Sequence, residues 1–162
     1  MMQRKFWGVL FLLCSAFILS STAEAKSARD RFDFDSEPEV SIEIHSYDNQ
    51  MIQAAQIAEI NARKHSHRRC WRAVKNAMLE AAVLDERPTT RYAKQAGEEL
   101  EKKFGFKRID VSDPFAAPIG SVLVYGGRGA GHIEIRTEDG FVSDFISEHP
   151  SNRPLIGVYV RI

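Results

Sequence analysis

Two side chains of this sequence have the chemistry of a hydrolytic pair, the thiol of Cys70 and the imidazole of His132. A thiolate attacks a carbonyl carbon readily once a nearby base has taken the thiol proton. The positive charges of Arg68 and Arg69 beside the cysteine favour the anionic sulfur. If Cys70 lies in the first turn of a helix, the unpaired amides there favour the same charge and can hold an oxyanion. The pair therefore predicts nucleophilic catalysis, provided that the fold brings both groups together.

A third group should orient the imidazole, and two carboxylates compete for this role. Glu134 shares a strand face with His132 but lies about 6.6 Å further along, at roughly 3.3 Å per residue. Asp144 lies on the segment that we expect to return beside the histidine strand. Because residues on neighbouring strands approach more closely than residues two apart on one strand, the sequence favours Asp144. The predicted catalytic residues are Cys70, His132 and Asp144.

Helices are predicted in the first half of the chain, where apolar residues recur at helical spacing. The first extends over 48–62 and begins at an aspartate that can cap it. The second extends over 68–84 and places Cys70 in its first turn. The third follows a turn at 87–90, where either threonine can act as its cap, and stops at Gly105. The second helix would therefore present the thiol at its amino end.

Strands are predicted in the C-terminal part, where apolar and polar residues alternate. A glycine-rich loop precedes the histidine strand, and Asp139-Gly140 is a hairpin turn after it. On this strand His132 and Glu134 share the polar face, so the imidazole points toward a cleft or solvent. Helices first and an antiparallel sheet afterward indicate an α+β fold with the N-terminal helices packed on the C-terminal sheet. The predicted strands extend over 121–125, 132–136, 141–145 and 157–162.

The N-terminus has the layout of a secretory signal peptide. A basic start and an apolar run over 6–19 precede the small residues Ala23 and Ala25, which suit signal peptidase. The apolar run is short for a membrane anchor, so we expect cleavage and an exported protein, periplasmic or secreted. The predicted organisation is a signal peptide at 1–25, a flexible leader with a candidate short strand at 26–46, and one hydrolase-like domain at 47–162.

Charge and cysteine content limit the classes of function that the sequence supports. The chain has 22 basic and 22 acidic residues, which gives no indication of nucleic-acid binding. Cys14 would leave with the signal peptide, so Cys70 would have no partner within the chain. In an exported protein such a thiol indicates an intermolecular disulfide, an inert buried side chain or a reactive group. His65 and His67 with Cys70 lack a distant fourth ligand, so no metal site is expected.

The order of these motifs resembles that of the NlpC-type cysteine peptidases and the related CHAP amidases. In those families a strand with a Gly-Asp start precedes the catalytic histidine's strand, and Gly120-Ser121 stands at the matching place. Gly131-His132 and the later Ser143-Asp144-Phe145 are similar to the family's histidine hairpin. Cys70-Trp71 resembles the nucleophile helix of bacterial peptidoglycan amidases, including type VI secretion effectors. Arg69 stands where the NlpC branch has the aspartate of Asp-Cys-Ser-Gly.

The resemblance covers roughly residues 68–162 and implies a papain-like fold of the NlpC type. It implies hydrolysis of an amide bond in the stem peptides of bacterial peptidoglycan, with Asp144 orienting His132 and no metal or organic cofactor. The implied partners are those stem peptides, without nucleic acid and without a membrane after signal removal.

Two functions of other classes stay open beside hydrolysis. The first is a catalytically inactive module that binds cell-wall peptides without cutting them. The second is an exported interaction protein in which Cys70 forms an intermolecular disulfide.

Overall fold

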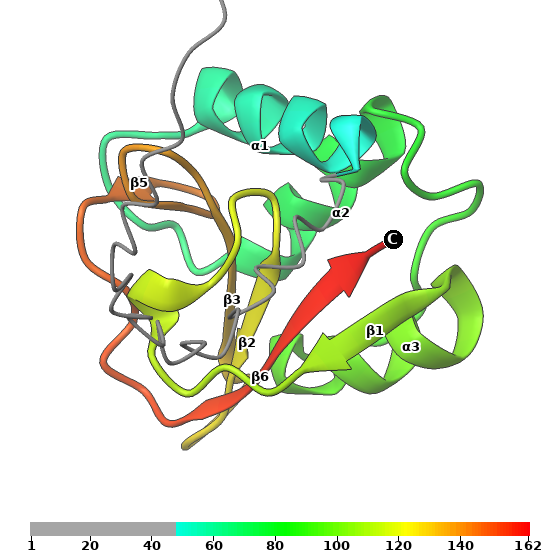
Figure 1. Ribbon diagram of the computed structural model, residues 1–162. Helices are drawn as coiled ribbons and strands as arrows, with labels where there is room; N and C mark the ends of the chain where they lie inside the picture. Colours follow the sequence, from blue (N-terminus) through cyan, green and yellow to red (C-terminus); the bar gives the residue numbers. More distant parts are fainter. Residues whose placement is uncertain (1–47) are drawn as a thin grey trace, which may run out of the picture. The chain divides into compact units, whose positions relative to one another are not determined.

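Three α-helices pack against an antiparallel sheet within residues 48–162, the part of the chain that the computed structural model describes (Figure 1). The predicted signal peptide and leader lie outside the described residues and stay predictions. No helix between residues 48 and 162 is both long and apolar enough to cross a membrane. The helices are α1 (Asn49–Asn61), α2 (Cys70–Glu80) and α3 (Ala96–Phe104), and two short 3₁₀ turns are η1 (Ala93–Gln95) and η2 (Pro114–Ala116).

The sheet has six strands, and every neighbouring pair is antiparallel. In space their order is β1-β6-β2-β3-β4-β5, so the last strand of the chain lies in the interior of the sheet. Helices packed on an antiparallel sheet confirm the predicted α+β fold. The strands are β1 (Phe106–Ile109), β2 (Val122–Tyr125), β3 (His132–Arg136), β4 (Phe141–Val142), β5 (Ile146–Ser147) and β6 (Leu155–Arg161).

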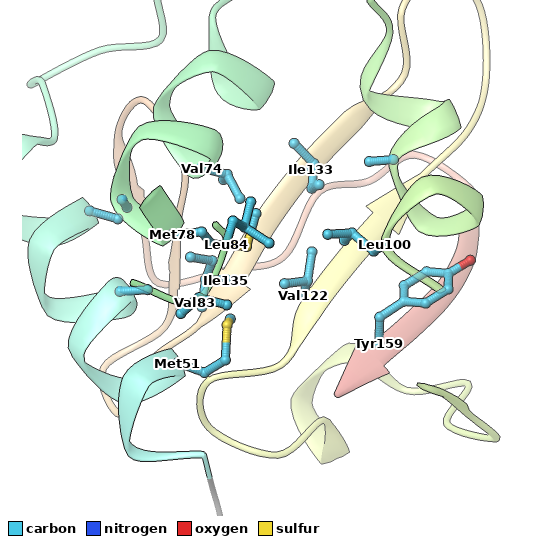
Figure 2. Packing of buried hydrophobic residues seen from close by; sticks show 14 of the residues in the cluster. Met51, Val74, Met78, Val83, Leu84, Leu100, Val122, Ile133, Ile135 and Tyr159 are labelled. Carbon is cyan, nitrogen blue, oxygen red and sulfur yellow. The ribbon is translucent and has the colours of Figure 1, made fainter. Parts of the chain in front are cut away.

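The main hydrophobic core lies between the helices and one face of the sheet (Figure 2). Met51 of α1, Met78 of α2 and Leu100 of α3 meet Ile133 and Ile135 of β3 in this core. The opposite sheet face is covered as well, by a smaller cluster that includes Leu123, Tyr125, Phe141 and Val158. Alternate residues of β2 therefore enter two separate apolar clusters, which buries both faces of this strand, whereas β3 contributes Ile133 and Ile135 to the main core.

The first two helices occupy the predicted segments with shorter bounds. The side chain of Asp48 accepts a hydrogen bond of 2.9 Å from the Gln50 amide, so it is the predicted cap of α1. The predicted second helix starts two residues too early, because Arg68 adopts a left-handed φ of 59° that no helix continues. Cys70 is consequently the first residue of α2.

The prediction that a threonine caps the third helix is wrong. Thr89 and Thr90 instead donate backbone and side-chain hydrogen bonds to the carboxylate of Glu99, which lies inside α3. The buried carboxylate needs donors, and the turn before the helix supplies four of them. Gly105 ends α3 with a φ of 72°, as predicted from its tolerance of that conformation.

Replacing Glu99 by glutamine should lower the free energy of unfolding by about 2 kcal/mol at pH 7, because charge-assisted hydrogen bonds are lost. Burial raises the pKa of Glu99, but the bonds from Thr90 and Thr89 outweigh it and lower the pKa from 4.5 to about 2. This stabilisation is present above pH 4.5 and is lost as the pH falls through about 2.

Urea denaturation at pH 7 and at lower pH values measures the difference between the native protein and Glu99→Gln. The exposed Glu98, which pairs only with Lys102 on the helix surface, supplies the matched control Glu98→Gln with little expected change. A Glu99→Gln difference that does not shrink as the pH approaches 2 would contradict this account.

The strands differ from the prediction at two places. β1 was not predicted, because its two central residues are both basic and give no apolar alternation. The expected return strand over 141–145 ends at Val142 as β4, and a tight turn, in which the Ser143 amide donates to the Phe145 carbonyl at 2.9 Å, leads from it into β5. The pairing between β3 and β4 is therefore only two residues long. Asp144 lies beyond it, so its side chain is not held beside β3 by strand pairing.

Candidate active site

Cys70 lies at the amino end of α2 and is half-buried. The amides of the first turn have no acceptor within the helix, and in the described chain the side chain of the cap residue Arg69 makes no capping hydrogen bond. The thiol therefore stands beside unpaired backbone donors and at the positive end of the helix dipole. This is the local setting that the sequence predicted for it.

His132 begins β3, directly after a glycine that the turn requires. Gly131 has a φ of 75°, and a Cβ atom there would lie 2.5 Å from the Tyr125 carbonyl oxygen. Only glycine fits this close approach, which lets the chain turn sharply and pair Tyr125 with His132 across β2 and β3. The tight turn thus sets the position of the imidazole at the end of the strand.

The imidazole of His132 and the thiol of Cys70 line the same cleft, and the sulfur lies close enough to raise the pKa of the imidazole. Burial lowers the pKa of His132, but the hydrogen bonds with Cys70 and Glu134 outweigh it and raise the pKa from 6.5 to about 9. The imidazole is therefore protonated at neutral pH, between a sulfur and a carboxylate that both favour the cation. The fold brings the predicted cysteine and histidine together.

Glu134 is the carboxylate that contacts the imidazole. Its Oε2 accepts a hydrogen bond of 3.1 Å from Nε2 of His132. Its Oε1 accepts from the Tyr125 hydroxyl at 2.6 Å and from the Ser151 amide at 3.2 Å. Burial, together with the Glu134 contact, raises the pKa of Tyr125 far above its ordinary value, so the phenol stays a donor. With its side chain only 4% exposed, Glu134 is held in one orientation.

Asp144, the carboxylate that the sequence favoured, lies elsewhere. Its Oδ2 accepts hydrogen bonds from the backbone amides of His67 at 2.7 Å and Arg69 at 3.0 Å. Continuing the β3–β4 register, in which Ile135 faces Val142, would set Asp144 opposite a core isoleucine and on the face away from the imidazole. The carboxylate therefore holds the segment that leads into the nucleophile helix, and Glu134 meets the imidazole.

The variant Asp144→Asn is expected to loosen this segment without changing the histidine. Losing the charge-assisted bonds should lower the free energy of unfolding by about 2 kcal/mol and speed hydrogen exchange at the amides of His67 and Arg69. The pKa of His132 should stay near 9, which an NMR titration of the imidazole measures. A fall in that pKa in this variant would show that Asp144 acts on the imidazole after all.

Tyr125 is a site residue that the sequence analysis missed, although a signal for it was present. The loop between the strands runs from Gly126 to Gly131, so a simple hairpin pairs Tyr125 with His132. Residues paired across antiparallel strands share a face, and that face also holds Glu134. The tyrosine hydroxyl could thus have been placed beside the carboxylate from the alternation alone.

An open cleft of about 760 Å³ gives access to the pair. Three segments form it: residues 66–70 before and at the nucleophile, the loop 128–131 before the histidine, and the chain over 145–153. A peptide can therefore approach Cys70 and His132 from solvent. Within residues 48–162 no group of three His, Cys, Asp or Glu side chains is placed to hold a metal ion.

The site brings together groups that acyl transfer could use: a thiol, an imidazole that contacts a buried carboxylate, and amide donors at a helix start. These groups lie in the α+β fold described above. No protein-family model and no curated protein sequence matches this chain.

The fold is similar to that of a chain in the crystal structure of the native type VI effector–immunity complex Tae3–Tai3 from Ralstonia pickettii. The TM-score is 0.54 at 23% sequence identity, and the match covers 69% of this chain and 98% of that one. The selenomethionine form of the same complex matches with a TM-score of 0.49 at 28% identity, over 59% of this chain and 80% of that one. The first likeness supports the fold class.

Proposed function

We propose that this protein is an exported cysteine hydrolase that cleaves an amide bond in the peptides of bacterial peptidoglycan. The observation that carries the proposal is that Cys70 and His132 line one cleft, with the sulfur close enough to raise the pKa of the imidazole, and that the imidazole contacts the buried carboxylate of Glu134. The motifs of the sequence resemble those of type VI amidase effectors, among other families. The similarity of the fold to a chain of a type VI effector–immunity complex supports this part of the resemblance. A closer relation to the NlpC and CHAP branches stays a prediction, as does export.

Acylation begins with an ion pair between the Cys70 thiolate and the His132 imidazolium. The sulfur attacks the carbonyl carbon of the substrate, and the carbonyl oxygen takes the negative charge beside the amides at the start of α2. His132 then gives its proton to the leaving nitrogen, so the amine departs neutral and a thioester remains on the sulfur. Glu134 acts through the imidazole by holding its orientation.

Deacylation reverses these roles. The now neutral His132 removes a proton from water, and the resulting hydroxide attacks the thioester carbonyl. The sulfur of Cys70 leaves as a thiolate, and the second peptide fragment departs as a carboxylic acid that loses its proton to water, while the released amine takes up a proton from water. One water is consumed, and one amine and one carboxylate are formed in each cycle.

The alternative of a disulfide-linked interaction protein receives less support from the geometry. Cys70 is half-buried in the cleft that His132 also lines, so a partner's cysteine would have to enter that cleft. Mobility on a non-reducing gel tests it, because a disulfide-linked form would move differently once reductant is added.

The hydrolysis itself is tested with purified sacculi. After incubation with the mature protein, mass spectrometry should find soluble peptide fragments that carry one new amine and one new carboxylate. Alkylating the protein with iodoacetamide beforehand should abolish these fragments, because Cys70 would be the only thiol left after signal cleavage. No fragments from the unmodified protein would contradict hydrolysis and favour a peptide-binding module.

A further inference from the structure

The cleft around Cys70 and His132 carries an excess of positive charge. Arg68, Arg128 and Arg153 line it, whereas the single acidic side chain that lines it among residues 48–162 is Glu134. The full chain has equal numbers of basic and acidic residues, so this excess belongs to the cleft and does not reflect the protein as a whole. A cleft that gathers charge of one sign attracts ligands of the other sign.

The carboxylate of Glu134 does not neutralise the positive charge of the arginines. Its carboxylate is shared among the His132 imidazole, the Tyr125 hydroxyl and the Ser151 amide, as described above. Because the imidazole is protonated at neutral pH, it compensates the charge of this carboxylate. An incoming ligand therefore meets the guanidinium groups and no competing free carboxylate among the residues that line the cleft.

Two of the three guanidinium groups are available to a ligand. Arg153 is already used, because its Nη1 donates to the Arg128 carbonyl at 3.0 Å and braces the loop before the histidine. The side chains of Arg68 and Arg128 make no hydrogen bond or ion pair within residues 48–162. Both are exposed, and they stand on different walls of the cleft, one beside the nucleophile and one on the histidine loop.

We propose that Arg68 and Arg128 bind a free carboxylate of the substrate, close to the amide that is cut. The substrate class is then an acidic peptide, and its amidated counterpart is a poor ligand. Guanidinium is suited to this task because its planar fork matches both oxygens of a carboxylate. This inference rests on the proposed hydrolytic function, since it assigns the substrate chemistry of the same cleft.

Binding is measured with the Cys70→Ala protein, so that no turnover occurs. The probes are a synthetic cell-wall tetrapeptide with free carboxylates and the same peptide with every carboxylate amidated. Isothermal titration calorimetry should give about tenfold tighter binding of the free acid, the size expected for one charge-assisted contact. Adding Arg128→Gln should reduce this preference to about twofold or less, whereas Arg128→Lys should retain part of it.

The matched control is Lys107→Gln, which removes one positive charge on β1, outside the residues that line the cleft. It should leave the preference for the free acid unchanged. Equal binding of the two peptides, no binding of either, or the same loss in Lys107→Gln and Arg128→Gln would overturn the inference. Tighter binding of a single-stranded oligonucleotide of equal charge would overturn it too, in favour of a nucleic-acid site.

Hydrolysis by the protein with Cys70 intact separates this inference from the proposed function. If the free acid binds preferentially but neither peptide is cut, the carboxylate site stands and the hydrolase proposal fails. If both peptides are cut at equal rates and bind equally, hydrolysis stands and the carboxylate site fails.

Discussion

Replacing Cys70 by alanine is expected to stop the release of new amines from sacculi, with a loss of at least about a thousandfold in rate. The sulfur is the only protein atom that forms a bond to the substrate carbon in the proposed mechanism. Without it, the imidazole and the helix amides could at most assist a slow attack by water. Mass spectrometry of the soluble fragments measures the rate over a time course.

The fold of the Cys70→Ala protein should be intact, because the side chain is small and only partly buried at the helix start. Circular dichroism and the melting temperature check this. Cys70→Ser keeps the size of the side chain but has a far weaker nucleophile, and it should be nearly as inactive. Equal fragment release by the native protein and by Cys70→Ala would exclude the thiol mechanism.

Replacing Glu134 by glutamine should lower the rate roughly a hundredfold or more, although the two side chains have the same shape. The glutamine oxygen would still accept from the Tyr125 hydroxyl, so its amide nitrogen would face Nε2 of His132. An amide donor requires a ring nitrogen without a proton, which favours the neutral imidazole and the wrong tautomer. The ion pair with Cys70 would then be lost.

The pH dependence follows from the same contact. In the native protein the rate should fall as the pH rises through about 9, where the imidazolium loses the proton that the leaving amine needs. In Glu134→Gln this alkaline limit should move toward the ordinary histidine pKa of 6.5. An NMR titration of the His132 ring gives the pKa directly, without relying on activity.

Asp144→Asn is the matched control for this experiment, since it also replaces a buried carboxylate by its amide but does not touch the imidazole. The histidine pKa should fall in Glu134→Gln and stay near 9 in Asp144→Asn. The reverse result would restore Asp144 to the role that the sequence assigned to it and remove Glu134 from it.

Local patterns were enough to predict the elements that carry the two reactive groups. Helical spacing and the cap at Asp48 indicated α1, and Gly105 indicated the end of α3. Alternation around His132 indicated β3 and the face on which the imidazole lies. These features depend on residues a few positions apart, so the physical cause of each is contained in the segment itself.

The pairing of the strands could be predicted less well from the sequence. β1 is stabilised by pairing with β6, and its basic residues carry no apolar period of their own. The return strand after the hairpin breaks at Ser143, because a turn there has its own hydrogen bond. A pattern of residue types does not contain the long-range pairing of β1 with β6, and tertiary context overrides strand propensity.

The sequence by itself determined that a thiol stands near a helix start and an imidazole at the start of a strand, which left two carboxylates as partners. Only the tertiary structure decided between them. In the structure Glu134 contacts the imidazole from two positions along β3, with Tyr125 and Ser151 of other segments donating to its second carboxylate oxygen, and Asp144 accepts from backbone amides near Cys70. The physical reason is that each buried carboxylate must find donors, and which donors lie within reach depends on how distant segments pack.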